Sequence, residues 1–353
     1  MMTDVLQQTL KQIQPLNPEW LARAQARLDQ LTKPRGSLGR LEELAAWYVA
    51  VREEMSPIIR KKAVVIFAGD HGVVAEGVSA YPQEVTFQMV ANFVQGGAGI
   101  NVLARHVGAE VQIVDIGVNH DFPGMPGLIS RKVRYGTGNL AREAAMSRDE
   151  AEAALLCGIE LAQENIAAGA DVLATGEMGI GNTTPAAALA AVFTGKPAAA
   201  VTGRGTGVDD HSYRHKVQVI ERALALHRPD PGDPMGVLAR LGGLEIAGLA
   251  GLILGSAAAR RPVLVDGFIA TAAALLAVRL CPAVRDYLAA AHQSAEFGHQ
   301  VMLAELKLEP LLQLRMRLGE GTGAALGMSL LEAGVKIYRE MATFAEAGVS
   351  DQD

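Results

Sequence analysis

The sequence predicts an α/β protein in which helices cover both faces of a parallel β-sheet. From residue 63 onwards, short apolar runs alternate with longer stretches of helical composition. Strands that are apolar along their whole length, separated by helices, are typical of parallel sheets buried on both faces. The chain has 353 residues, of which 50% are hydrophobic and 20% charged. This supplies enough apolar material for a full core and excludes a disordered chain.

Residues 1–60 are predicted to be helical. Apolar side chains recur at helical spacing in two stretches, first at Leu6 and Leu10 and then within residues 41–48. The segment KPRGSLG at 33–39 has the Pro and Gly content of a loop. We therefore expect separate helices joined by this loop.

The remaining chain supplies the sheet and its helices. The predicted strands are AVVIFAGDHG (63–72), VQIVDIG (111–117), DVLATGE (171–177), AAAVTGRGTG (198–207) and PVLVDGF (262–268), with LAAAHQSAE (288–296) as a less regular sixth. Helices are predicted between them, as at 86–105, 149–168 and 211–226, and again from 322 to roughly 345. We expect the two helical ends, residues 1–60 and 321–353, to form a small helical domain beside a large α/β domain at 61–320 that carries the active site.

Charge and cysteine content restrict the possible partners and compartment. The formal net charge is 32 − 38 = −6, which argues against a nucleic acid or an anionic membrane surface as partner. The two cysteines, Cys157 and Cys281, are too few for a disulfide framework and match no metal-ligand spacing. No signal peptide is read at the start, and the longest apolar run, 246–259, is shorter than the roughly 20 residues that cross a bilayer. A cytoplasmic protein is expected.

The loops that follow the predicted strands carry the candidate chemistry. Ligands bind at the carboxyl ends of the strands in an open parallel sheet. Here these ends read GDHG, GEMGIGN, GRGTG and DGF. Any one of them is explained by turn formation and helix capping, which also favour Gly and Asp. Taken together they favour a site, because turns alone do not require a glutamate inside two separate glycine loops.

Two of these loops are suited to phosphate. GEMGIGNTT at 176–184 has the spacing of a P-loop, but Asn182 replaces the lysine, which argues against a nucleoside triphosphate. Its backbone N–H groups at a helix start still suit a monophosphate or a developing anion. GRGTG at 203–207 is a weak match to a dinucleotide motif because its third glycine comes one residue early. With Lys216 in the following helix, it is a reasonable second phosphate cradle.

Two further side chains each allow two interpretations. Glu320 lies between glycines just before a predicted helix. On spacing alone we favour an acidic helix start stabilised by the helix dipole, which contributes about 0.3–1 kcal/mol. The alternative is a carboxylate held on a rigid turn as a general base. His71 in GDHG has no second histidine at ligand spacing, so we interpret it as a hydrogen-bonded loop histidine rather than a metal ligand.

Six motifs together carry a family resemblance. They are KPRGSLGRLE, DHGV followed by EGVSAYPQEVT, GEMGIGNTTPAAA, VDGF, SAEFGH and LGEGTGAAL, in consistent order over roughly residues 30–345. The chain resembles the nicotinate-nucleotide:dimethylbenzimidazole phosphoribosyltransferases of cobalamin biosynthesis. This implies transfer of phosphoribosyl from nicotinate mononucleotide to 5,6-dimethylbenzimidazole, giving α-ribazole 5′-phosphate and nicotinate with inversion at C1. It also implies a homodimer, a Rossmann-like large domain and no cofactor or metal.

The resemblance also assigns site residues. Glu320 matches the catalytic proton acceptor, and Glu177 matches a second acidic residue of the same site. The positions matched to phosphate and ribose binding are Gly176, Gly179, Asn182, Thr183, Gly203, Gly205, Lys216 and Asp266. Those matched to the pocket of the acceptor base are Ser79, Tyr81, Met89 and Leu318.

Other functions remain open at this point. A kinase or NTPase would use the P-loop-like segment 176–184, although Asn182 argues against it. A non-catalytic nucleotide or base binder would use the same loops without releasing nicotinate. The identity of the acceptor base, whether a benzimidazole, a purine or a phenolic compound, is not fixed by the sequence.

Overall fold

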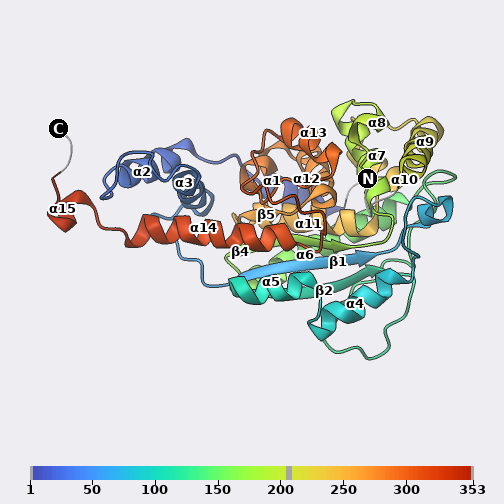
Figure 1. Ribbon diagram of the computed structural model, residues 1–353, viewed down its shortest axis with the longest axis horizontal. Coiled ribbons are helices and arrows are strands. Elements are labelled where there is room, and N and C mark those ends of the chain that lie inside the picture. The colour runs from blue at the N-terminus through green and yellow to red at the C-terminus, as the bar shows by residue number, and fades with distance from the viewer. Residues whose placement is uncertain (1–2, 204–208, 351–353) are drawn as a thin grey trace.

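A six-stranded, all-parallel sheet forms the centre of the computed structural model, which describes residues 3–203 and 209–350 (Figure 1). The strands are β1 (Lys62–Gly69), β2 (Ala109–Gly117), β3 (Leu128–Ser130), β4 (Val172–Met178), β5 (Val263–Val265) and β6 (Leu288–Ala290). Their order is β3-β2-β1-β4-β5-β6. Successive strands are added on one side of β1 up to β3 and on its other side from β4 onwards. Ligands of open α/β sheets bind at such a switch point, here between β1 and β4. The predicted α/β class is confirmed.

Strand β1 shows why both faces of the sheet must be covered. Every residue of β1 is buried. Val65 and Phe67 contact one apolar cluster, and Val64 and Ile66 contact the cluster on the opposite face. Successive side chains of a strand point to opposite faces, so an unbroken apolar strand needs a helical layer on each side.

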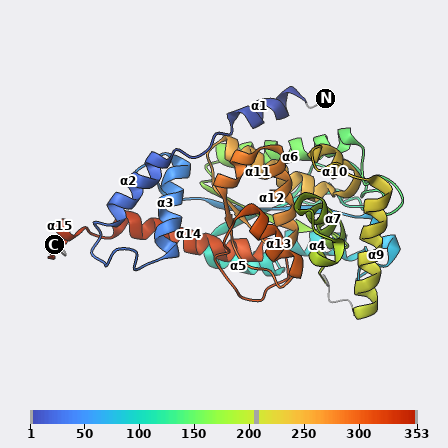
Figure 2. The same ribbon diagram turned by 90° about the horizontal axis from the view of Figure 1, so that it is seen from above.

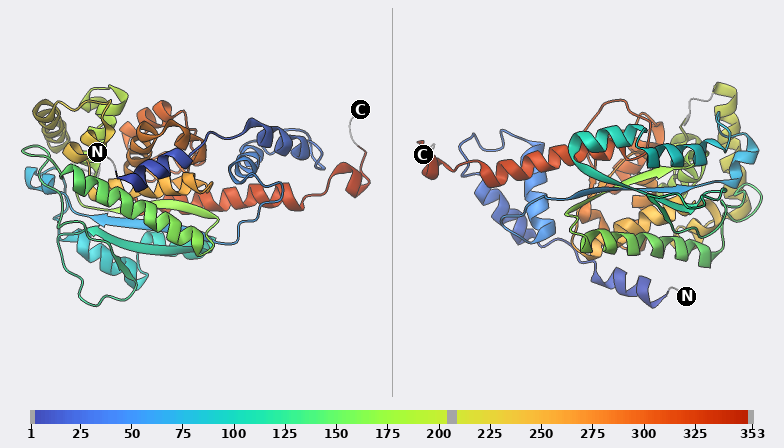
Figure 3. Two further views of the ribbon diagram at one scale, coloured as in Figure 1. Left: turned by 180° about the vertical axis from the view of Figure 1, so that it is seen from behind. Right: turned by 90° about the horizontal axis from the view of Figure 1, so that it is seen from below.

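Two helical layers supply this cover (Figure 3). The first contains α1 (Asp4–Gln12), α6 (Arg148–Ala167), α7 (Thr183–Thr194), α10 (Pro234–Leu241), α11 (Leu244–Ala258) and α12 (Phe268–Leu280). The second contains α4 (Val85–Gln95), α5 (Gly99–Val107) and α14 (Thr322–Glu340). Further elements pack against the first layer, and together with the sheet and both layers they form the body of the molecule. They are α8 (Ala198–Val201), α9 (Asp210–His227), α13 (Phe297–Leu306) and the 3₁₀ turns η1 (Gly72–Glu76) and η2 (Pro282–Tyr287).

Glycines let the two central helices of the first layer approach closely. A Cβ on Gly158 of α6 would lie 1.9 Å from the carbonyl oxygen of Gly248 in α11. A Cβ on Gly251 would lie 1.9 Å from the carbonyl oxygen of Leu155. Only glycine fits at such backbone contacts, so these positions fix α11 against α6 and hence under the sheet.

The two ends of the chain meet in a helical lobe, formed by α2 (Pro18–Leu28), α3 (Arg40–Arg52) and the second half of α14 (Figures 1 and 2). Its small core contains the buried residues Leu28, Val49 and Tyr338. α14 starts on the sheet and runs out into this lobe, and α15 (Phe344–Ala347) follows it. The first helix, α1, packs instead against α11 of the body. The domain limits at residues 60 and 320 stay a prediction.

Several predicted elements are wrong in detail. Residues 198–201, expected as part of a strand, form the short helix α8, and residues 204–207 of that run lie outside the described part of the chain. The predicted helix 86–105 is two helices, α4 and α5, separated at Gly96, whose φ is +81°. The edge strand β3 was not expected. In the described residues, no helix is both long and apolar enough to cross a membrane.

Candidate active site

A cavity of about 520 Å³ opens at the carboxyl ends of the central strands. Five segments far apart in the sequence line it, four of them loops that follow β1, β4, β5 and β6, and the fifth the turn before α14. The lining residues are Val78, Ser79, Tyr81, Val85 and Met89, then 177–183, 267–269, His292, Ser294 and Glu296, and 317–320. This is the edge of the sheet at which the sequence predicted a site.

The turn that carries Glu320 has an uncommon backbone. Gly319, Glu320 and Gly321 have φ values of +82°, +63° and +91°. A side-chain-bearing residue in this left-handed region is strained, and such residues cluster at functional sites. The turn lies directly on β4, because a Cβ on Gly176 would approach the carbonyl oxygen of Glu320 to 2.7 Å. Asp266 holds it from below by accepting a hydrogen bond from the backbone N–H of Gly321 (3.3 Å).

The two oxygens of the Glu320 carboxylate have different surroundings. Oε2 accepts a hydrogen bond from the backbone N–H of Ile100 (3.0 Å) at the start of α5. Oε1 accepts no hydrogen bond from the described residues, and Glu320 is one of the residues that line the cavity. Burial, the largest cause, raises the pKa of Glu320, the Ile100 N–H lowers it, and the nearby Asp266 raises it. The expectation that Glu320 is an acidic helix start is wrong, since its carboxylate contacts α5 and not α14.

Glu177, at the end of β4, lies beneath the same turn. Its carboxyl accepts hydrogen bonds from the side-chain N–H of Asn182 and from the backbone N–H of Glu320. Burial together with the negative charges of Asp266 and Glu245 raises the pKa of Glu177 to about 8. At neutral pH this group is therefore largely protonated, so it adds little repulsion against an ionised Glu320.

The start of α7 forms another part of the cavity wall. Asn182 is the residue before the helix, and Thr183 is its first residue. The Thr183 hydroxyl accepts a hydrogen bond from the buried Nζ of Lys216 (2.7 Å). Burial lowers the pKa of Lys216 to about 8, and Glu296 opposes this shift. Backbone N–H groups at a helix start and a nearby ammonium group are suited to an anion such as a phosphate.

Asn182 bears on the kinase alternative. It occupies the position of the P-loop lysine and donates its side-chain N–H to Glu177. An amide used in this way supplies no positive charge for the β- and γ-phosphates of a nucleoside triphosphate.

His71 lies below the floor of the cavity and is fully buried. Its Nε2 lies 2.8 Å from Oε1 of Glu245, which confirms the prediction of a hydrogen-bonded loop histidine. Gly179 packs directly on this pair, since a Cβ there would lie 3.1 Å from Nε2 of His71. Within residues 3–203 and 209–350, no group of three His, Cys, Asp or Glu side chains is placed to hold a metal ion.

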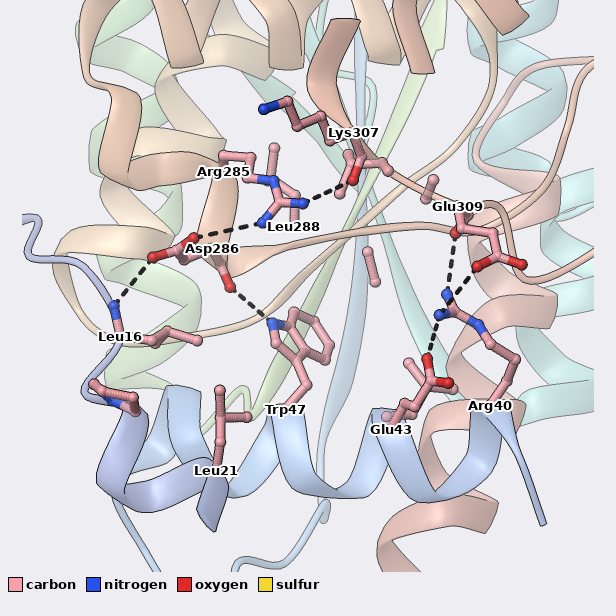
Figure 4. Close-up of a pocket in the computed structure, with 15 residues that line it drawn as sticks. Leu16, Leu21, Arg40, Glu43, Trp47, Arg285, Asp286, Leu288, Lys307 and Glu309 are labelled. Carbon is pink, nitrogen blue, oxygen red and sulfur yellow. Dashed lines mark hydrogen bonds and ion pairs between the residues drawn. The ribbon is translucent and has the colours of Figure 1, made fainter. Parts of the chain in front are cut away.

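A second cavity, of about 450 Å³, lies between the helical lobe and the edge strand β6 (Figure 4). Figure 4 shows two connections between the two sides, one through Asp286 and one between Arg40 and Glu309. The carbonyl oxygen of Asp286 accepts a hydrogen bond from Nε1 of Trp47 (2.7 Å), and its Oδ2 accepts one from the backbone N–H of Leu16 (3.1 Å). The charged side chains around it are balanced, with Arg40, Arg285 and Lys307 facing Glu43, Asp286 and Glu309. This cavity is separate from the carboxyl ends of β1 and β4.

Comparisons with known proteins identify the family. A family model described as phosphoribosyltransferase matches residues 13–349. A nicotinate-nucleotide–dimethylbenzimidazole phosphoribosyltransferase from Geobacter sulfurreducens is 62% identical over 349 residues, covering 99% of each chain. The chain belongs to this family. The same-named protein of Chloroflexus aggregans is 57% identical and also covers 99% of each chain.

Solved structures of the family share the fold. The crystal structure of nicotinate-nucleotide–dimethylbenzimidazole phosphoribosyltransferase from Thermus thermophilus superposes with a TM-score of 0.90 at 51% identity. The alignment covers 96% of this chain and all of that one. A second structure from the same organism, of CobT, gives a TM-score of 0.92 at 53% identity and covers 95% of this chain and all of that chain. The resemblance inferred from six sequence motifs is confirmed.

Most of the residues predicted from the phosphoribosyltransferase family motifs line the first cavity. These are Ser79, Tyr81, Met89, Glu177, Gly179, Asn182, Thr183, Leu318 and Glu320. Tyr81 and Leu318 are 53% and 60% exposed and stand at its mouth. Four others, Gly176, Gly203, Lys216 and Asp266, lie behind the lining residues, and Gly205 is outside the described part of the chain. Their roles stay predictions.

The structure adds lining residues that the sequence reasoning did not assign. Three of them, His292, Ser294 and Glu296, follow β6. The SAEFGH motif marked this segment as part of the family pattern but did not indicate which side chains face the cavity. Phe268 and Ile269, which follow the VDGF motif, start α12 and add an apolar patch. Arg317 adds a permanent positive charge to the lining.

Proposed function

We propose that the protein transfers the 5-phosphoribosyl group from nicotinate mononucleotide to 5,6-dimethylbenzimidazole, as the names of its relatives indicate for them. The products are α-ribazole 5′-phosphate and nicotinate, with inversion at C1. The observation that carries the proposal is the Glu320 carboxylate, which is anchored through Oε2 in the wall of the cavity and leaves Oε1 without a hydrogen bond from the described residues. A fixed acceptor of this kind is what the reaction needs.

The proton balance of the reaction explains the role of Glu320. An unprotonated ring nitrogen of dimethylbenzimidazole attacks C1 of the ribose, and the bond from C1 to the nicotinate nitrogen breaks. Positive charge develops on the attacking ring, which makes its second N–H acidic, and Oε1 of Glu320 accepts that proton. Burial raises the pKa of Glu320, which brings its basicity closer to neutral pH, where general bases are most effective.

The leaving group needs no further activation. The nicotinate nitrogen is quaternised in the substrate and becomes neutral as it leaves, so the electron pair of the broken bond is accepted by a positive ring. The ribose passes through an oxocarbenium-like state, as in glycosidases. We therefore propose a reaction without metal or cofactor, in which attack opposite the leaving group gives the α product.

One part of the cavity suits the acceptor base, and another suits the 5′-phosphate of the donor. Tyr81, Met89 and Leu318 offer apolar surface for the acceptor base on the β1 side. The start of α7, with Thr183 and the Lys216 ammonium behind it, suits the 5′-phosphate. Holding the phosphate away from the reacting centre orients C1 against the base and the Glu320 carboxylate.

Two broader statements belong to the same proposal. We propose that the chain acts as a homodimer, which the family resemblance supports, and that it works in the cytoplasm, which the low cysteine content supports. A sedimentation analysis that found only monomers at the assay concentration would contradict the dimer.

The central test replaces the proton acceptor by its neutral isostere. In Glu320→Gln the amide oxygen still accepts the Ile100 N–H, so the fold is retained, but no carboxylate is left to take the proton. We expect kcat to fall by about 10²- to 10⁴-fold. The measurement is release of nicotinate with both substrates present, with the product identified by mass and its anomeric configuration by NMR coupling.

Glu160→Gln is the matched control, because it makes the same chemical change at an exposed position of α6. It should leave kcat within a factor of two. Turnover by Glu320→Gln at the wild-type rate would reject the assigned role, and a β-configured product would reject the single displacement.

A further inference from the structure

His292 lines the cavity but takes no part in the proposed proton transfer or phosphate binding. It follows β6 by two positions and is 2% exposed. Two glycines hold its ring in place. A Cβ on Gly323, in the first turn of α14, would lie 1.9 Å from Nδ1, and a Cβ on Gly267 would lie 3.4 Å from Cε1. The imidazole is therefore fixed between the starts of α12 and α14, next to the turn that carries Glu320.

The two nitrogens of this ring have different surroundings. Nδ1 is buried without a hydrogen-bond partner among the described residues, and the nearest acidic oxygen is Oδ1 of Asp266 at 3.8 Å. Asp266 is itself fixed by the backbone N–H groups of Gly321 (3.3 Å) and Ala324 (3.0 Å). Nε2 is not enclosed and lies on the cavity side of the ring. In a neutral imidazole one nitrogen carries the proton and the other is an acceptor, so a proton on Nδ1, on the side of Asp266, leaves the lone pair on Nε2.

The neighbouring His299 shows what a purely structural histidine looks like in this fold. Its Nδ1 accepts the backbone N–H of Ser294 (2.8 Å), and its Nε2 lies 2.8 Å from the Thr271 hydroxyl. Both nitrogens are therefore used inside the protein, and burial lowers the pKa of His299 to about 3. His292 differs because one of its nitrogens remains available to a ligand.

The surroundings of Nε2 select the kind of ligand group. The acidic side chains of Glu320, Glu177 and Asp266 lie together at this end of the site, as their mutual effects on pKa show. An ionised Glu320 carboxylate disfavours an anionic group of the ligand directly beside it, whereas a hydroxyl donor suits a neutral acceptor nitrogen. During the transfer C1 is separated from the proton that Glu320 accepts by the width of one imidazole ring. We therefore place the sugar, with its 2′- and 3′-hydroxyl groups, in the part of the cavity that Glu320 and His292 both line.

We propose that His292 is a substrate-binding residue whose Nε2 accepts a hydrogen bond from a hydroxyl group of the phosphoribosyl sugar, with its ring held by packing against Gly323 and Gly267. This inference rests on the proposed function and deepens it. It also changes the interpretation of Asp266, which the family motif matched to the ribose. The Asp266 carboxyl lies behind the cavity wall, and His292 stands at the wall itself.

The experiment compares three substitutions that keep different atoms of the ring. His292→Gln keeps a polar atom near the position of Nε2, His292→Asn keeps one near Nδ1, and His292→Ala keeps neither. We expect kcat/KM for nicotinate mononucleotide to fall about 10- to 100-fold in His292→Ala, because one hydrogen bond is lost and a buried polar group of the substrate is left unpaired. His292→Gln should recover part of this loss and His292→Asn should not, and KM for dimethylbenzimidazole should stay within twofold.

Deoxy analogues of the substrate identify the contact directly. One of two analogues of nicotinate mononucleotide, the 2′-deoxy or the 3′-deoxy form, lacks the hydroxyl that contacts His292. The kcat/KM of the wild-type enzyme for that analogue should be lower by about the same factor as the substitution His292→Ala causes with the normal substrate. With that analogue, His292→Ala should lose little more, because the variant and the analogue remove the same hydrogen bond. His106→Ala, at an exposed position of α5, is the control and should behave as wild type.

Several outcomes overturn the inference. The first is an unchanged kcat/KM in His292→Ala. The second is that the loss caused by His292→Ala adds fully to the loss caused by each deoxy analogue. The third is recovery of activity in His292→Asn but not in His292→Gln, which would mean that the ring only supports α14. A loss that instead tracks the replacement of nicotinate by nicotinamide in the substrate would assign the contact to the leaving group. If His292→Ala does not fold, the comparison of Gln with Asn and the wild-type analogue data still decide. Failure of the proposed function is distinguishable, because the wild type would then form no ribazole product.

Discussion

The two oxygens of the Glu320 carboxylate have separate surroundings, and the proposed function uses one for position and the other for the reaction. The anchor of the carboxylate is an amide of α5, and the N-terminal amides of α14 are bound instead by Asp266 from the neighbouring strand end. Because Asp266 caps α14, Glu320 is not needed as a cap and its second oxygen stays available. The sequence placed Glu320 just before a helix, where a cap and a base look alike. The capping residue is 58 positions away from Ala324, so no local pattern could separate the two interpretations.

Glu177 should make the stability of the protein depend on pH. Its pKa is about 8 in the folded chain against an ordinary value of 4.5, so between these values only the folded state keeps the proton. Wild-type stability should therefore fall as pH rises from about 4.5 to 8 and change no further above 8. Glu177→Gln lacks this proton equilibrium, so its stability relative to wild type should increase across that window, by at most about 1.4 kcal/mol per pH unit.

Urea unfolding of both proteins at several pH values on either side of neutrality measures this difference. The exposed Glu160→Gln should show a constant difference from wild type over the same range. A constant difference for Glu177→Gln as well would mean that the Glu177 carboxyl is ionised throughout.

At the scale of elements, α5 positions the reactive carboxylate and leaves little room around it. A Cβ on Gly99, the first residue of α5, would lie 2.9 Å from Cδ2 of Leu318 and 3.3 Å from Oε2 of Glu320. The φ of Gly99 is not in the left-handed region, so alanine can adopt its backbone. A methyl group here must therefore displace side chains of the site rather than strain the helix.

Gly99→Ala should separate activity from stability. We expect kcat/KM to fall about tenfold, since small displacements of a catalytic group are costly. The thermal midpoint should stay level or rise slightly, because alanine is the better helix former. Val102→Ala, at an exposed position of the same helix, is the control for activity. A loss of activity that is matched by a large fall in the midpoint would contradict this account.

The errors in predicting elements have physical causes. The run AAAVTG suggests a strand because it is apolar and ends in glycine. Alanine is the strongest helix former, however, and Pro197 supplies a suitable helix start, so Ala198–Val201 is helical. β3 gives no clear sequence signal because it is three residues long and follows a segment rich in Pro and Gly. The strands β1 and β2 are predicted correctly because they are long and rich in Val and Ile, so their composition distinguishes them from helices.

The candidate site was predictable to a similar extent. Residues that follow long strands in glycine loops, such as Glu177 and Thr183, are found from the sequence because position and composition coincide. Lys216 and Asp266 have motif positions that suggest contact with a ligand, but in the structure they lie behind the lining residues, next to Thr183 and His292. His292 follows a three-residue strand, and only tertiary packing against Gly323 gives its ring a direction.

On the scale of the whole molecule, α14 joins the helical lobe to the sheet as one continuous helix. Its first turns cover β4 and β5 and its last turns complete the lobe core at Tyr338. Trp47 adds a hydrogen bond from α3 to Asp286 at the edge of the body. The lobe core is small, so we expect the lobe to depend on these connections for its stability.

This dependence predicts that lobe and body unfold together. Both tryptophans of the chain, Trp20 and Trp47, lie in the lobe helices, so tryptophan fluorescence reports the lobe, while far-UV circular dichroism reports the whole chain. Urea unfolding curves from the two signals should coincide. Leu28→Ala in the lobe core should lower the free energy of unfolding by about 2–5 kcal/mol and move both curves equally. A fluorescence transition that precedes the dichroism transition would show an independent lobe.

The left-handed backbone at position 320 has a consequence for how the protein tolerates change. A glycine there would release a conformational penalty on the order of 1–2 kcal/mol and remove a buried acidic group. Selection for robustness alone would therefore erase this glutamate. Selection for catalytic turnover would therefore be needed to keep a glutamate at this position. In a copy of the chain that is no longer selected for turnover, we expect substitutions to accumulate early at this residue.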